Sequence, residues 1–250
     1  MGTYVSILKY PSHSHREDFR NKLIDLAKKY GNKAFVYKRF RPKIGGYEIV
    51  ADLKIRLDYK QQTLIGSPPI YVEIDVPSRV EHLDGAWDVK EKKWVCLYFY
   101  DADPDLEDIA LAISNGAAGP KAFFEAIMYL KLTRPQKIRV KFARTKEFVN
   151  SISRLGSLGW VVMTGIPDRE LHTAMFWGNN LQRHEIIKDL IKRGAEIKAL
   201  VIKNPSKRIT IVISDKGSIF SYKNLEPIEA AGELKELIKF FKSSNLFIFE

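Results

Sequence analysis

Four short segments of this chain alternate apolar and polar residues, at positions 33–41, 48–59, 70–76 and, most strictly, 137–142. This alternation is typical of a β-strand with one buried face and one solvated face. Half-solvated strands occur mostly in antiparallel sheets, so we expect such a sheet here. In the last segment the apolar residues are Ile138, Val140 and Phe142, and the basic residues between them are Lys137, Arg139 and Lys141.

Residues 95–100 form a different pattern, a continuous apolar run, which favours a strand buried on both faces. The segments that follow this run read as helices and strands in turn. Such alternation predicts an α/β layer in the middle of the chain. The expected helices cover residues 106–114, 120–132 and 146–155, and the expected strands cover residues 137–143 and 160–163.

The two ends of the chain complete the expected fold. A strand at 3–9 precedes a helix that Ser14 and Glu17 would begin as a capping box. The overall prediction is an α+β fold with a mixed sheet over residues 1–166, antiparallel at its N-terminal part. A small α-βββ-α-β unit follows over residues 167–250. Its expected helices are 169–177, 181–193 and 228–242, and its expected strands are 196–203, 208–214, 218–223 and 246–249.

Two stretches, 28–43 and 131–146, carry basic residues and no acidic ones. The formal net charge of the chain is +11, so no acidic segment elsewhere cancels them. A surface of this kind suits a polyanion, and a sugar-phosphate backbone is the leading candidate partner. The expected nucleic-acid contacts are Lys38, Arg39 and Arg41 in the first stretch, and Lys137, Arg139, Lys141 and Arg144 in the second.

The composition narrows the class of protein further. Cys96 is the single cysteine, which excludes an internal disulfide and a cysteine-rich zinc site. No apolar run approaches the length of about 20 residues that spans a bilayer, and no signal peptide is expected, so we predict a cytoplasmic protein without a membrane partner. Abundant Lys, Glu and Ile with only four Gln favour a thermophilic source. Trp160 and Trp177 are expected in the core.

An acidic cluster follows the apolar run, with Asp101 and Asp103 at its start. Two carboxylates at the end of a central strand could hold a hard cation such as Mg²⁺ or Mn²⁺. Helix capping explains the same residues, because Asp103 suits an N-cap and Pro104 suits a first helical turn. The residues alone leave both interpretations open.

The segment WVCLYFYDADPD resembles the apolar strand ending in Asp-x-Asp of archaeal and eukaryotic-type primases. The overlapping segment DADPDLEDIALAI is similar to the strand-to-helix step of Toprim domains in topoisomerases and bacterial primases. Either resemblance implies that Asp101 and Asp103 bind a divalent metal, and the Toprim resemblance implies Glu73 as an upstream acid. The element order of residues 181–249 resembles restriction-endonuclease-like domains, although Ser221 stands where their acid-x-Lys motif has its acid.

Three functional hypotheses follow from the sequence. The first is a nucleic-acid-binding protein that uses a basic sheet face in nucleic-acid maintenance or processing. The second is a metal-dependent enzyme of phosphoryl or nucleotidyl transfer, centred on Asp101 and Asp103. The third is a docking subunit of a larger complex, which would use the same basic faces against an acidic partner.

Overall fold

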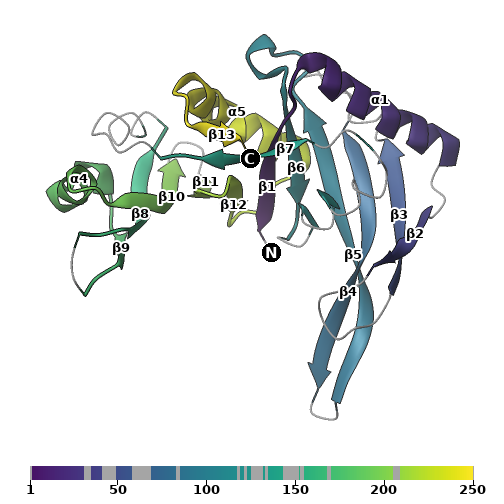
Figure 1. Cartoon of the computed structure of the whole chain (residues 1–250), viewed down its shortest axis with the longest axis horizontal. Coiled ribbons are helices and arrows are strands. Elements are labelled where there is room, and N and C mark those ends of the chain that lie inside the picture. The colour runs from purple at the N-terminus through teal and green to yellow at the C-terminus, as the bar shows by residue number, and fades with distance from the viewer. Residues whose placement is uncertain are drawn as a thin grey trace. The chain divides into compact units, whose positions relative to one another are not determined.

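The protein is an α+β structure, described here by a computed structural model (Figure 1). Its packing divides the chain into two compact units. We call Leu8–Gln136 the N-terminal unit, and Met1–Ile7 together with Lys137–Glu250 the C-terminal unit. The boundary expected at residue 166 falls inside the C-terminal unit. The structure describes residues 2–30, 35–40, 49–57, 69–82, 85–116, 119–120, 123–124, 132, 135–142, 152, 155–167, 170–204 and 209–249.

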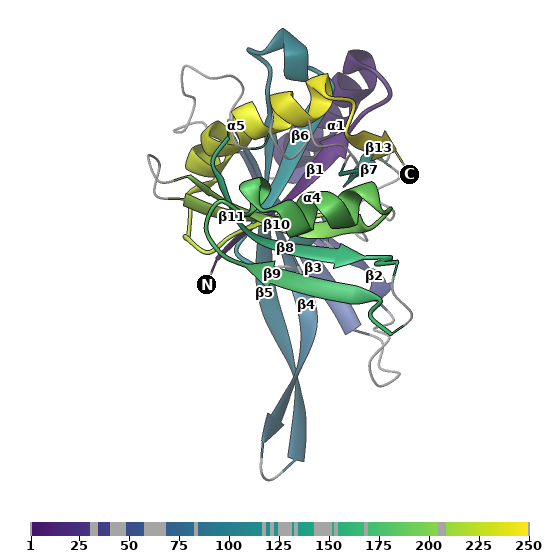
Figure 2. The same ribbon diagram turned by 90° about the vertical axis from the view of Figure 1, so that its left-hand side faces the viewer.

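The sheet of the N-terminal unit contains five strands whose described pairings are all antiparallel. The long β4–β5 hairpin extends well beyond its neighbours (Figure 2). β5 lies between β4 and β6, and its residues 95–99 are buried, which confirms the expected central strand. In sheet order the strands are β2 (Phe35–Phe40), β3 (Ile49–Leu57), β4 (Ile70–His82), β5 (Gly85–Phe99) and β6 (Ile109–Ser114).

Helix α1 (His13–Tyr30) packs against this sheet, and the two share a hydrophobic core. The helix contributes Phe19 and Leu23, one turn apart on one face, and the strands contribute Leu97 and other side chains. The expected helix is confirmed, but its cap is not Ser14. Ser12 begins it, because the Ser12 carbonyl accepts from the Arg16 amide at 3.2 Å and the Ser12 hydroxyl accepts from the His15 amide at 3.4 Å.

The helix predicted at 106–114 is wrong. One turn of 3-10 helix, η2 (Pro104–Leu106), is followed by strand β6, which pairs with β5 through Cys96 opposite Ile113. Every residue of β6 is buried. A short apolar run with two alanines is consistent with either a buried helix or a buried strand, and here sheet pairing overrides the helix propensity of alanine.

In the C-terminal unit, the first residues of β1 pair with β12. Its described pairings are also antiparallel. In sheet order the strands are β1 (Thr3–Lys9), β12 (Ser218–Ser221), β11 (Ile209–Ser214), β10 (Glu196–Asn204), β8 (Ser157–Thr164) and β9 (Thr173–Trp177), and a separate pair is formed by β7 (Gln136–Val140) and β13 (Phe247–Phe249).

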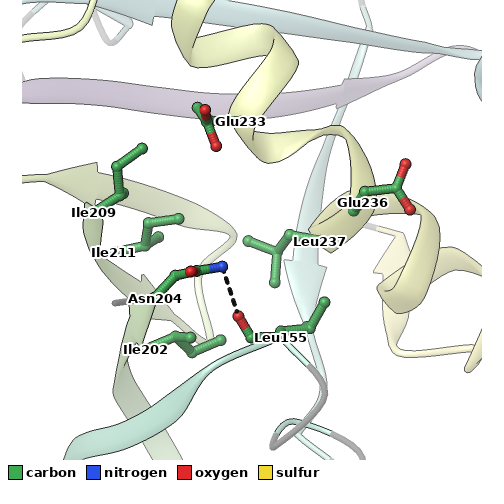
Figure 3. Close-up of a pocket in the computed structure, with 8 residues that line it drawn as sticks. All are labelled: Leu155, Ile202, Asn204, Ile209, Ile211, Glu233, Glu236 and Leu237. Carbon is green, nitrogen blue, oxygen red and sulfur yellow. Dashed lines mark hydrogen bonds between the residues drawn. The ribbon is translucent and has the colours of Figure 1, made fainter. Parts of the chain in front are cut away.

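The helices of this unit are η3 (Leu181–Arg183), α4 (Glu185–Lys192) and α5 (Pro227–Ser243), close to the expected 181–193 and 228–242. Helix α5 lies over one face of the sheet, where it borders a cavity of about 210 Å³ (Figure 3). Leu237 of the helix and Ile202 and Ile211 of the strands supply much of the apolar lining. The covered face is therefore the core face of this sheet.

The helix predicted at 169–177 is also wrong, because residues 173–177 form β9, which pairs with β8. Exposure alternates along β9, as expected of an edge strand. The hairpin predicted at 215–217 is confirmed. Gly217 has a φ of +72°, and a Cβ there would collide with the Ile138 carbonyl, so glycine is required.

Two expected helices lie largely outside the described residues. Of 120–132 only residues 120, 123 and 124 are described as helical, and of 146–155 only residue 152. None of the helices in the described ranges is long and apolar enough to cross a membrane.

Candidate functional site

Asp101, the first candidate metal ligand, follows the end of β5 and forms an ion pair with Arg16 of α1. Its Oδ1 lies 2.9 Å from Arg16 Nη2, and its Oδ2 lies 3.9 Å from Arg20 Nη2. The Arg16 side chain is only 1% exposed, and that of Asp101 is 20% exposed. A cation from the protein itself therefore already neutralises this carboxylate.

Arg16 has further neighbours. Glu17 Oε1 lies 3.1 Å from its Nη2, and its guanidinium carbon lies 5.9 Å from the centre of the Phe99 ring. Its Nε and Nη1 atoms are buried without a hydrogen-bond partner among the described residues, as is the Tyr10 hydroxyl. Burial raises the pKa of Tyr10 well above its usual value, and the Arg16 charge lowers it in part. These atoms form a polar cluster within an apolar core.

Sequence reasoning missed Arg16. The signal was its spacing, because Arg16, Phe19 and Leu23 lie three and four residues apart and so share one face of the helix. A charged residue on the core face of a helix is rarely buried without an opposite charge. That rule predicts a carboxylate partner for Arg16, but it does not say which one.

Asp103 serves as a helix cap. Its Oδ1 accepts a hydrogen bond from the Asp105 amide at 3.2 Å, its side chain is buried, and Pro104 occupies the first position of η2. The capping interpretation is thus confirmed, since the carboxylate meets an amide that the first turn leaves without a helical partner.

Glu73 does not join the other two acids. It lies on β4 opposite Trp94 of β5, and Phe99, the last residue of β5, lies five positions further along the strand. At about 3.3 Å per residue this is roughly 16 Å, several times the reach of one shell of metal ligands. The arrangement implied by the Toprim resemblance, with Glu73 as the upstream acid, is therefore not formed.

Two tyrosines line the end of β5 beside these acids. Burial, followed by the charge of Asp101 and by Cys96, raises the pKa of Tyr98 to about 12. Burial also raises the pKa of Tyr100 well above its usual value. Both phenols are neutral at physiological pH, as an ordinary tyrosine is, and the raised pKa values move their ionisation further from it. In the described part of the chain, no group of three or more His, Cys, Asp or Glu side chains is placed to hold a metal ion.

A thermal melt tests the hypothesis that Asp101 and Asp103 hold a divalent metal. We expect Mn²⁺ to leave the melting temperature of the protein unchanged, because Arg16 occupies the Asp101 carboxylate and Asp103 caps η2. A bound ion would instead stabilise the fold by about 2.7 kcal/mol at a hundredfold excess over its dissociation constant. A rise in melting temperature that Asp101→Asn abolishes would contradict our expectation and support the metal-dependent enzyme.

The second basic stretch forms a strand as predicted. On β7, Ile138 and Val140 are buried and Arg139 is exposed; beyond its end Phe142 is buried and Lys141 is exposed. Pairing with β13 and a hydrogen bond from the Lys141 amide to the Leu246 carbonyl, at 2.7 Å, hold this segment in place. Only the backbone of Lys137 is described, and Arg144 lies outside the described residues.

Of the first basic stretch, Lys28 and Lys29 are exposed at the end of α1, and residues 35–40 are described only through their backbone. Lys38 and Arg39 lie on β2, where the register with β3 passes from Tyr37 opposite Ala51 to Phe40 opposite Ile49. One extra residue on β2 indicates a β-bulge, which interrupts strict alternation at the two basic residues. Arg41 lies outside the described residues.

A third surface was not predicted. Trp177, expected in the core, is 74% exposed on the edge strand β9, and Trp160 beside it on β8 is half-buried. The signal was the alternation of residues 173–177, which indicates a strand with Thr173, Met175 and Trp177 on one face. Because residues 173–177 were predicted as a helix, the exposed face with Met175 and Trp177 was not predicted.

No family model matches the chain, and neither curated proteins nor solved structures gave a significant match.

Proposed function

We propose that this protein binds nucleic acid through basic residues displayed on sheet surfaces. The observation that carries the proposal is the segment 138–142, in which buried apolar side chains hold Arg139 and Lys141 on the exposed side. A rigid strand that spaces cations two residues apart, roughly 6.6 Å, suits the regular charges of a phosphate backbone.

The charge of the C-terminal unit supports this proposal. Residues 1–7 and 137–250 contain 20 Lys and Arg and 12 Asp and Glu, so most of the excess of +11 belongs to the unit that carries Arg139 and Lys141. A net positive unit attracts a polyanion over distances of about a Debye length, about 8 Å at physiological salt.

A salt titration tests the proposal. Replacing Arg139 and Lys141 together by Ala should weaken binding to nucleic acid. If each residue meets one phosphate, the plot of log affinity against log salt should flatten by about 1.8 units for duplex DNA or about 1.4 units for a single strand. The measurement is fluorescence anisotropy with a labelled oligonucleotide at several salt concentrations. An unchanged slope would remove this strand from the contact surface.

The matched control removes the same charge elsewhere in the C-terminal unit. Lys192 and Arg193, at the end of α4, are both exposed. Their double replacement by Ala should reduce affinity through net charge alone and leave the slope nearly intact. If the wild-type protein binds acidic proteins but no nucleic acid, the docking-subunit hypothesis replaces the proposal.

A further inference from the structure

A row of apolar and mostly aromatic side chains crosses the sheet of the C-terminal unit on the face opposite α5. Strand registers place each member directly opposite the next. Directly opposed residues of neighbouring strands project to the same face, so the row is continuous over six strands. Its members, in order from β9 to β1, are Trp177, Trp160, Val201, Val212, Phe220 and Tyr4.

Exposure distinguishes the two faces of this sheet. On β11, β12 and β1 the side chains on the α5 face include Ile213, Ile219 and Val5, all buried, whereas Val212, Phe220 and Tyr4 on the row are half-buried. At its β9 end the row opens to solvent, since Trp177 is 74% exposed. Val201 in the middle of the row is buried, and Tyr222, which follows β12 beside Phe220, is 68% exposed.

The aromatic rings at one end are already organised. Phe220 lies between Tyr4, at 4.6 Å between ring centres, and Tyr222, at 4.8 Å. Such contacts fix the ring planes before a ligand arrives, so the ordering cost on binding is small. Large exposed aromatic side chains are uncommon on surfaces that serve no contact.

The positive charge that would attract an anionic ligand to this face comes from one exposed lysine and from the unit as a whole. Glu196 and Asp215 each lie 3.4 Å from Lys198, whose single charge balances one of the two carboxylates. Lys203, two residues beyond Val201 on β10, is exposed. The surface therefore combines flat rings with a positive charge, and it belongs to the more basic of the two units.

We propose that this face stacks the bases of a single-stranded nucleic acid. A single strand exposes the π-faces of its bases, whereas a duplex buries them between stacked base pairs. The exposed aromatic rings of the protein therefore contribute to the binding of single strands and not of duplexes. This inference rests on the proposed function and specifies its ligand. A stacking platform needs rings and nearby cations but no base-specific hydrogen bonds, so sequence preference is weak.

The test compares a single-stranded oligonucleotide of about 15 nucleotides with a duplex of the same length, a size that covers the usual sites. Trp177→Ala should weaken single-strand binding roughly 5- to 150-fold and leave duplex binding nearly unchanged. Trp177→Phe should retain most of the affinity, because the ring remains. Tyr222→Ala should act like Trp177→Ala.

The matched control is Ile186→Ala, which removes an apolar side chain that is 49% exposed on α4. Ile186→Ala should change neither the affinity for the single strand nor the affinity for the duplex. If the wild type binds single strands and both ring variants bind equally well, the stacking face is disproved while the proposed function stands. The stacking face is also disproved if the ring variants lose as much affinity for the duplex as for the single strand. A wild type that binds neither ligand overturns the proposed function as well.

The aromatic face could alternatively bind a protein, such as a second copy of this chain. Sedimentation of the wild type and Trp177→Ala distinguishes it from a nucleic acid. A wild-type dimer that Trp177→Ala dissociates, with single-strand binding unchanged, would make this face a protein interface and overturn the inference.

Discussion

Leu97→Ala should lower the free energy of unfolding by about 2 to 5 kcal/mol. Leu97 is fully buried at the centre of the N-terminal unit, where β5 is flanked by β4 and β6 and packs beneath α1. Truncation removes transfer free energy and leaves a cavity, because a close-packed sheet relaxes only in part. Urea denaturation at equilibrium measures the loss, with the slope checked for a second transition.

Leu171→Ala is the matched control for this change. It removes the same atoms from a side chain that is exposed, and should alter stability by no more than about 0.5 kcal/mol. A comparable small loss for Leu97→Ala would show that β5 is not the centre of a packed core.

Asp101→Ala should cost about 3 kcal/mol, because it leaves the buried Arg16 guanidinium with Glu17 as its one close carboxylate among the described residues. Removing one member of a buried pair is far more costly than replacing both. We therefore expect the double variant Arg16→Met with Asp101→Leu to regain much of the stability, since apolar side chains of similar size suit the core beside Phe99.

An exposed pair on the same helix provides the control. Lys22 and Asp18 are 2.7 Å apart, closer than Arg16 and Asp101, but both side chains are 48% exposed. Water screens them, so Asp18→Ala should cost less than about 1 kcal/mol. If Asp101→Ala costs no more than Asp18→Ala, burial does not decide the strength of the Arg16–Asp101 pair. The denaturation experiment used for Leu97 serves for both variants.

Local patterns predicted most strands of this fold correctly. The alternation at 137–142 and the apolar run at 95–100 both correspond to the burial observed. The two segments mistaken for helices are short, and neither length nor composition separated the alternatives. Residues 109–114 became a strand because β5 supplies the backbone partners, and residues 173–177 because β8 does.

The candidate site was predicted less well. Capping by Asp103 is local, since its carboxylate bonds an amide two residues away, and the sequence pattern indicated it. The Arg16–Asp101 pair joins residues 85 positions apart, and Glu73 was grouped with Asp101 although the β4–β5 register separates them. The distances between these side chains depend on strand register and on the position of the helix, and a short sequence motif does not determine either of them.

The amino-acid sequence by itself determined the basic charge, the alternating faces of strands such as β7 and the buried run of β5, because each depends on neighbours within a few residues. Only the tertiary structure decided which faces meet. It paired Arg16 with Asp101, and it aligned Tyr4 with Phe220, residues from opposite ends of the chain, in one row. The physical reason is that register across a sheet is set by the burial of whole faces, a property of all the strands together.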